Sequence, residues 1–319
     1  MKREISMKKF LVTGSLGQIG TELVEALKKQ YGRDNVVASG VDDSANVKVD
    51  GAYEFLDVTD AKRYHEVVKK HDIDTVIHLA AILSAKGEEN PHLLWNINMN
   101  GLYNTLEIAR EEGLKVFTPS SIAAFGPSTP MDNTPQVTIQ RPTSIYGVSK
   151  VAGELLCDYY YHKFGVDTRG VRYPGIISYK QLPGGGTTDY AVHIYFDALK
   201  KGKFICNLGP ETKLDMMYMD DAVGCVLDLL EADPERLIDR NAFNVSAMSI
   251  DPEMMKKSIQ KVIPDFTIEY DVNPVLQEIA NSWPNSLDVS AAEAQWDFKP
   301  KYDLDKMTET MLKGIKETY

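Results

Sequence analysis

The stretch Phe10-Leu-Val-Thr-Gly-Ser-Leu-Gly-Gln-Ile-Gly20 joins a short apolar run to a glycine-rich turn and the start of an amphipathic segment. It predicts a buried strand over residues 8–13 and a helix over about residues 18–31. Between a strand and a helix, glycines let the backbone approach a pyrophosphate, and the free N–H groups of the helix start favour an anion. We therefore predict dinucleotide contacts here, against the alternative of a tight turn without a ligand, from Gly14, Gly17, Gln18, Ile19 and Gly20.

Strand-like and helix-like patterns alternate from this turn to about residue 173. Such alternation predicts a parallel sheet with crossover helices, a Rossmann-type doubly wound α/β fold. The regular pattern fades after Pro174, where a glycine-rich loop precedes an amphipathic helix. We expect residues 7–174 to form a dinucleotide-binding domain. Residues 175–319 should mainly form a smaller substrate-binding or lid domain, with residues of about 213–246 packing back on the first domain.

Charge and composition exclude several classes of partner. The 319 residues carry a net charge of −11 without a basic cluster, which disfavours nucleic acid or an anionic membrane surface. The three cysteines are far apart and fit no metal spacing, so we expect no metal. No apolar run reaches membrane-spanning length, and residues 1–9 lack the apolar core of a secretion signal. These observations predict a cytoplasmic protein.

Tyr146-Gly-Val-Ser-Lys150 lies in a predicted helix that begins after Pro142. Residues four apart share one helix face, so the phenol and the ammonium should be neighbours. An ammonium at roughly 5 Å, with an effective dielectric constant of about 20, favours a phenolate by about 3 kcal/mol. Upstream, Ser120-Ser121 follows a predicted strand and places a hydroxyl at the sheet edge where ligands bind. The pair predicts proton transfer; the alternative is an incidental Tyr and Lys on a surface helix.

The position expected to bind the adenosine ribose carries an unusual residue. An acid normally stands about 20 residues after the last glycine of the turn, where this chain has Gly40. Asp42 and Asp43 follow, and no Lys or Arg between residues 36 and 47 could meet a 2′-phosphate. The sequence therefore favours NAD over NADP. Asp57-Val58, after the third predicted strand, suits adenine contacts, although Asp57 suits a helix-leading turn equally well.

The glycine turn, the serine turn and Tyr-x-x-x-Lys, in this order, resemble the extended short-chain dehydrogenase/reductase superfamily. Three further stretches agree with its motifs: His78-Leu-Ala-Ala81, Asn98-Met-Asn-Gly101 and Tyr218-Met-Asp-Asp221. Over nearly the whole chain, the sequence is similar to the short-chain L-threonine 3-dehydrogenases. Distinctive stretches are Pro119-Ser-Ser-Ile-Ala-Ala-Phe-Gly-Pro127, Arg172-Tyr-Pro-Gly-Ile-Ile177, Leu182-Pro-Gly-Gly-Gly-Thr-Thr-Asp-Tyr190 and Ser282-Trp-Pro-Asn-Ser-Leu-Asp288.

This resemblance implies NAD-dependent oxidation of the β-hydroxyl of L-threonine to 2-amino-3-oxobutanoate. Tyr146 would act as the base, assisted by Lys150, and Ser121 would orient the substrate oxygen. The resemblance also implies cofactor contacts from Leu79, Ala80, Ala81, Asn98, Ser120, Tyr173 and Pro174, besides Tyr146 and Lys150. Implied substrate contacts are Ser84, Thr187, Thr188 and Trp283. Three of them also have a purely structural alternative: Ser84 as the end of a loop, Thr187 as a helix cap and Trp283 as a core residue. We interpret His78 as structural.

Two rival functions remain open at this stage. A nucleotide-sugar epimerase or dehydratase usually has an Asn shortly after the Arg-Tyr strand and an Arg before Tyr-x-Asp-Asp, where this chain has Arg172-Tyr-Pro-Gly175 and Leu214. A non-catalytic NAD-sensing module could dispense with Tyr146, Lys150 and Ser121, which are all present. The resemblance also implies a homodimer formed through the predicted helices at residues 91–112 and 142–164.

Overall fold

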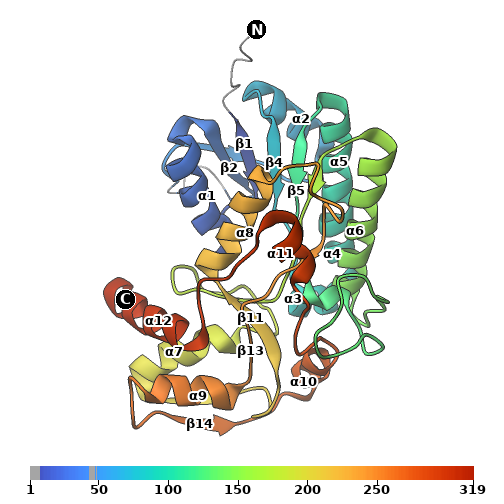
Figure 1. Ribbon diagram of the computed structural model, residues 1–319. Helices are drawn as coiled ribbons and strands as arrows, with labels where there is room; N and C mark the ends of the chain where they lie inside the picture. The colour runs from blue at the N-terminus through green and yellow to red at the C-terminus, as the bar shows by residue number, and fades with distance from the viewer. Residues whose placement is uncertain (1–7, 43–46, 48) are drawn as a thin grey trace.

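A six-stranded parallel sheet forms the centre of the molecule (Figure 1). The computed structural model describes residues 8–42, 47 and 49–319. The strand order is β3 (Ala52–Phe55), β2 (Val36–Gly40), β1 (Phe10–Thr13), β4 (Thr75–His78), β5 (Lys115–Phe117) and β7 (Thr168–Arg169). All of these pairs run parallel. The predicted Rossmann-type doubly wound α/β fold is confirmed.

Helices cover both faces of the sheet, as the apolar run of β1 requires. Successive strand residues point to opposite faces. Phe10 and Val12 pack in a core with α1 (Gln18–Tyr31) and α8 (Met219–Glu231), whereas Leu11 packs in a second core with helices of the other face. Those helices are α2 (Ala61–Lys70), α5 (Gly101–Glu112) and α6 (Ile145–Phe164). The short turn η1 (Arg33–Asn35) leads into β2.

Two predicted elements are interrupted in the structure. The helix predicted over residues 91–112 consists of α4 (Pro91–Trp95), a π-helical turn η2 (Asn96–Asn100) and α5. The last strand of the alternating pattern breaks at Gly170 into β7 and β8 (Val171–Tyr173). A Cβ at Gly170 would lie 2.2 Å from the Thr118 carbonyl oxygen, so close backbone contact causes this break. Beyond it, β8 pairs with β6 (Ser120–Ser121) and β12 (Phe243–Asn244).

The second half of the chain builds a smaller layer at the carboxyl edge of the large sheet (Figure 1). Its sheets pair β11 (Leu214–Tyr218) with β9 (Gly175–Ile177) and β13 (Met248–Ile250), and β10 (Lys203–Cys206) with β14 (Thr267–Tyr270). The remaining helices are α3 (Ser84–Glu89), η3 (Ile122–Ala124), α7 (Tyr190–Lys201), α9 (Pro252–Gln260), α10 (Pro274–Asn281), α11 (Ser290–Trp296) and α12 (Leu304–Thr318). A domain boundary near Pro174 stays a prediction.

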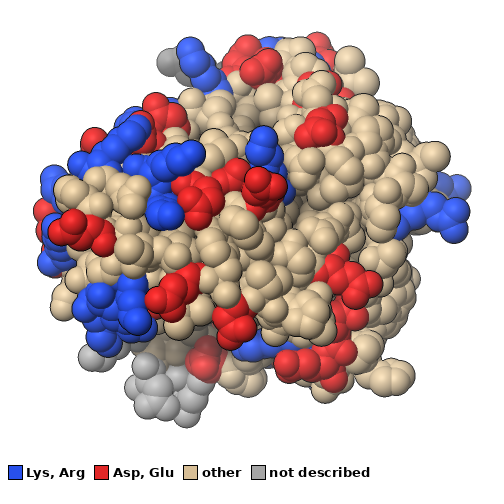
Figure 2. Space-filling view, turned by 90° about the horizontal axis from the view of Figure 1, so that it is seen from below, with Lys and Arg blue, Asp and Glu red and all other residues tan. Residues whose placement is uncertain are grey.

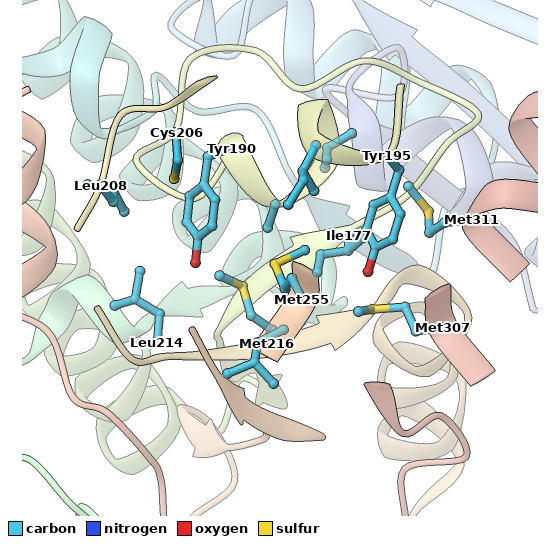
Figure 3. Packing of buried hydrophobic residues seen from close by; sticks show 14 of the residues in the cluster. Ile177, Tyr190, Tyr195, Cys206, Leu208, Leu214, Met216, Met255, Met307 and Met311 are labelled. Atoms are coloured by element: carbon cyan, nitrogen blue, oxygen red, sulfur yellow. The ribbon is translucent and has the colours of Figure 1, made fainter. Parts of the chain in front are cut away.

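The core of this layer is rich in methionine (Figure 3). Met216, Met255, Met307 and Met311 are all fully buried and pack around Tyr190 and Tyr195. Unbranched thioether side chains fill irregular gaps and adapt to neighbouring shapes. The core beneath the glycine-rich loop is therefore easily repacked.

Acidic and basic side chains are interspersed on the face of the molecule shown in Figure 2. None of the helices in the described part of the chain could cross a membrane. Within residues 8–42, 47 and 49–319, no group of three His, Cys, Asp or Glu side chains is placed to hold a metal ion.

Candidate active site

The glycine turn between β1 and α1 is shaped by close backbone contacts. Gly14 has φ of 64°, and a Cβ there would lie 2.8 Å from the Ala80 backbone nitrogen. A Cβ at Gly20 would lie 2.5 Å from the Gly14 carbonyl oxygen. Gly17 precedes α1 and provides no side-chain cap. Only glycine fits this turn, and the first N–H groups of α1 are left to a ligand.

One cavity of ≈ 480 Å³ begins at this turn and extends to the smaller layer. It brings together most of the residues predicted from the sequence: Gly14, Gly17, Gln18, Ile19, Gly20, Leu79, Ala80, Ala81, Ser84, Ser120, Ser121, Tyr146, Lys150, Tyr173, Pro174, Thr187, Thr188 and Trp283. Sequence reasoning missed other lining residues, among them Leu16, Ile122, Gly175 and Asp189. Leu16 lies in the glycine turn, and the other three lie in stretches quoted for the resemblance. The sequence did not single them out, because no chemical role was predicted for them.

The glycine end of the cavity fits a dinucleotide. Among the described residues, the Gln18 Nε2 atom is buried without a hydrogen-bond partner. A buried donor without a partner costs about 1–3 kcal/mol, so a ligand that accepts its hydrogen bond stabilises this end. The Gly14 cradle and the start of α1 supply the backbone groups for a pyrophosphate.

Tyr146 lies in the first turn of α6 and is 8% exposed. Ser144 caps this helix, accepting a hydrogen bond from the Gly147 N–H at 3.0 Å. The Lys150 Nζ atom lies 5.3 Å from the centre of the Tyr146 ring and donates to the Pro119 carbonyl at 2.9 Å. The phenol and the ammonium therefore share one face of α6 and one cavity.

The two hydroxyls of the serine turn have different environments. The Ser120 hydroxyl donates to the Glu154 carboxylate. The Ser121 hydroxyl accepts a hydrogen bond from the Ala123 N–H at 3.2 Å, which starts η3. Its own proton therefore remains to be donated to a ligand in the cavity. Of the two residues, Ser121 is the one whose side chain is free to serve the candidate site.

A buried ion pair joins α6 to the strands beside the site. Arg172 of β8 donates through Nε and Nη2 to the two carboxylate oxygens of Glu154, at 3.0 and 2.9 Å. Gln140 donates to the same carboxylate at 2.8 Å, and Asn244 accepts from Arg172 at 3.0 Å. The spacing of Glu154 from Lys150, four residues along α6, could have suggested its inward position.

Asn98 lies beside the site, but its amide is occupied. It accepts from the Ile82 N–H at 2.8 Å and donates to the Ile82 carbonyl at 3.1 Å. This double contact ties η2 to the segment after β4 that carries Leu79, Ala80 and Ala81. Asn98 lines a smaller cavity of ≈ 40 Å³ behind Lys150, not the main one.

Asp57 and Val58 are not among the residues that line the main cavity. The Asp57 carboxylate accepts from the Thr59 N–H at 2.9 Å and the Thr59 hydroxyl at 2.7 Å, which is the turn role weighed from the sequence. Val58 is buried beside Gly101. Their adenine contacts stay a prediction.

His78 is buried at the end of β4, where its Nδ1 atom lies 3.0 Å from the Thr105 hydroxyl. Burial, with a smaller effect of the Lys150 charge, lowers the pKa of His78 to about 3. The imidazole is therefore neutral at physiological pH and lies in the smaller cavity. These contacts agree with a structural role.

The loop before α7 forms another part of the wall of the main cavity. Asp189 accepts hydrogen bonds from the Gly185 and Gly186 N–H groups at 2.9 and 2.8 Å, and burial raises the pKa of its carboxyl. Thr187 does not cap the helix, because α7 starts at Tyr190 without a side-chain cap. Its buried hydroxyl has no partner. Trp283 both packs in the core and lines the cavity.

Comparison with known proteins agrees with this geometry. Residues 10–246 match the model of the NAD dependent epimerase/dehydratase family. An L-threonine dehydrogenase structure from Clostridium difficile is 58% identical, covers 98% of each chain and superposes with a TM-score of 0.95. A monomeric L-threonine 3-dehydrogenase from a metagenome is 44% identical, with a TM-score of 0.93, and covers 97% of this chain and 99% of its own. An uncharacterized epimerase/dehydratase of Staphylococcus saprophyticus is 58% identical over 97% of both chains.

Proposed function

Because the chain belongs to the NAD dependent epimerase/dehydratase family, we propose that it oxidises L-threonine at its β-hydroxyl with NAD, giving 2-amino-3-oxobutanoate. One observation carries this proposal: Ser121, Tyr146 and Lys150 line the same cavity as the glycine turn. The similarity to L-threonine dehydrogenases over nearly the whole chain supports the choice of substrate.

The chain's own residues would perform the acid–base part of the reaction. Tyr146, as phenolate, would take the proton of the substrate hydroxyl, and the adjacent Lys150 ammonium favours that phenolate. Ser121 would donate a hydrogen bond to the substrate oxygen and hold it beside the phenol. Bound NAD would supply the hydride acceptor. The glycine-rich loop with Thr187 and the wall with Trp283 would hold the amino acid and exclude water.

A sugar-nucleotide substrate is the main rival within this family. The site offers little to a second diphosphate, because Leu214 is buried in the apolar core at the place of the expected Arg. Pro174 and Gly175 line the cavity where the expected Asn would stand, and neither has a polar side chain. A diphosphate without charge-assisted partners binds weakly.

Absorbance of reduced nicotinamide tests the proposal. We expect rapid growth on mixing the protein with NAD and L-threonine, and little growth with L-serine or L-allo-threonine. UDP-glucose and UDP-galactose serve as rival substrates, with epimer formation followed by chromatography. Epimer formation without threonine oxidation would replace the proposal with the rival, and binding of NAD without either reaction would favour the sensor module.

Thr187→Val should raise the KM for L-threonine about tenfold without lowering thermal stability. Valine has a similar shape, and it removes a buried hydroxyl that has no partner, so the folded protein loses no hydrogen bond. A bound substrate that accepts from this hydroxyl would lose about 1–1.5 kcal/mol. Steady-state kinetics and a melting curve measure both quantities. An unchanged KM would remove Thr187 from the substrate site.

We also propose a homodimer formed through α5 and α6. Their outer faces expose several large apolar side chains, with Leu155 61% and Tyr159 52% exposed, beside Tyr103, Val148 and Phe164. Several exposed large apolar side chains on two neighbouring helices favour an interaction surface. A cytoplasmic location and a domain boundary near Pro174 remain further predictions.

Leu155→Glu should convert the dimer to a monomer, because a carboxylate would be buried in the interface. Light scattering after size-exclusion chromatography measures the mass. Ile238→Glu is the matched control, since Ile238 is 85% exposed and lies outside α5 and α6. A wild-type monomer, as described for the metagenome relative, would contradict the proposed dimer.

A further inference from the structure

Strand β2 ends at Gly40, the position at which folds of this type usually carry an acid for the adenosine ribose. The backbone does not require glycine there, because Gly40 is not among the residues with positive φ. Its carbonyl accepts from the Leu56 N–H at 2.8 Å, as ordinary strand backbone does. The absence of a side chain therefore needs another explanation.

The side chain of Tyr53 provides it. A Cβ at Gly40 would lie 3.1 Å from the Tyr53 hydroxyl oxygen, whereas its next neighbour, the Leu16 side chain, is at an ordinary contact distance of 3.8 Å. Tyr53 belongs to β3, directly beside β2, and its ring extends along the sheet to the end of β2. A side chain on residue 40 would be crowded by this hydroxyl at its Cβ, and one of the two groups would have to shift. Gly40 and Tyr53 are thus a complementary pair.

The Tyr53 hydroxyl is held in place and retains acceptor capacity. It donates to the Asp42 carbonyl at 3.1 Å, which leaves its oxygen lone pairs available. Burial, with a smaller effect of the Asp42 charge, raises the pKa of Tyr53, so the phenol stays neutral at physiological pH. Gly40, Val41 and Asp42 line the same cavity as the glycine turn. Tyr53 is not itself among the lining residues, but its hydroxyl lies next to Gly40 at this end.

We propose that the Tyr53 hydroxyl replaces the missing acid and accepts a hydrogen bond from the adenosine ribose of the cofactor. The inference rests on the proposed NAD site but not on threonine as the substrate. A neutral phenol accepts from one ribose hydroxyl and does not repel a 2′-phosphate, whereas a carboxylate accepts from both hydroxyls and repels the phosphate. We expect rejection of NADP to depend on Asp42, an acid among the described lining residues at this end.

Calorimetric titration with ADP-ribose, which lacks the nicotinamide, tests the contact without any turnover. We expect Tyr53→Phe to weaken binding about three- to tenfold, the range for one lost hydrogen bond. The same substitution at Tyr319, which is 69% exposed at the chain end, should leave binding unchanged. Asp42→Asn should improve binding of the 2′-phosphorylated form relative to ADP-ribose, because it removes a carboxylate that repels the phosphate.

A double-mutant cycle tests the pairing of Gly40 with Tyr53 directly. Gly40→Asp should weaken ADP-ribose binding in the wild-type background, because the carboxylate meets the hydroxyl. In the Tyr53→Phe background the same change should strengthen binding and increase the preference over the 2′-phosphorylated form. Additive effects, or Tyr53→Phe binding like wild type, would overturn the role of Tyr53 and leave the proposed function intact. Failure of the wild-type protein to bind ADP-ribose would overturn the cofactor site itself.

Discussion

We expect Tyr146→Phe to lower kcat for threonine oxidation by about a thousandfold, because general-base catalysis contributes about 10²–10⁴-fold. Phenylalanine keeps the ring that packs in the core and removes only the hydroxyl. The fold and the glycine turn should be unaffected. Steady-state kinetics, together with calorimetric titration of NAD, separates the loss of chemistry from a loss of binding.

Tyr159→Phe is the matched control for this result, since Tyr159 lies on the same helix but is 52% exposed. It should retain full activity. Turnover by Tyr146→Phe within about tenfold of wild type would refute the assignment of Tyr146 as the base.

Arg172→Met should lower the free energy of unfolding by about 3–5 kcal/mol, the cost of leaving one partner of a buried ion pair alone. The side chains of Arg172 and Glu154 are only 7% and 5% exposed, so water cannot replace the lost guanidinium. The substitution also removes the contacts to Asn244 and to the Gln136 carbonyl. Urea unfolding followed by circular dichroism measures the change.

The double variant Glu154→Gln with Arg172→Met should be more stable than Arg172→Met alone, because a neutral amide costs less to bury than an unpaired carboxylate. The exposed pair Lys201–Asp197, with 3.0 Å between its charged atoms, supplies the control. Lys201→Met should cost less than about 1 kcal/mol. Equal losses at the buried and exposed pairs would contradict the role of burial.

The fold followed from the sequence wherever one local pattern decided the structure. The apolar run before Gly14 predicted β1, and the helical spacing of Tyr146 and Lys150 placed both side chains in one cavity. The sequence could not show that Gly170 touches the Thr118 carbonyl, or that Asn98 binds the backbone of Ile82. Both contacts join residues that are not neighbours in the chain. One lies where β7 ends, and the other lies within the π-helical turn between α4 and α5.

The candidate site also combines residues that the sequence reveals with residues that only the fold reveals. Motif residues were found because their chemistry depends on short spacings, whereas Glu154 and Arg172 act through a contact between a helix and a strand. Only the fold could reveal that Ser120 is tied to Glu154 and that Ser121 is free. The departure at Gly40 was visible in the sequence, but its explanation required the position of the Tyr53 hydroxyl.

Four buried methionines in the core of the smaller layer also make their oxidation a measure of how often this layer opens. Their sulfur atoms are shielded from solvent in the closed structure, with Met216, Met255, Met307 and Met311 all 0% exposed. Peroxide can form a sulfoxide at these positions only when the layer opens. The added polar oxygen then disrupts the packing and prevents the layer from closing again. The rate of sulfoxide formation, followed by peptide mass spectrometry, thus measures how often this half of the molecule opens, and a ligand that holds it closed slows the reaction.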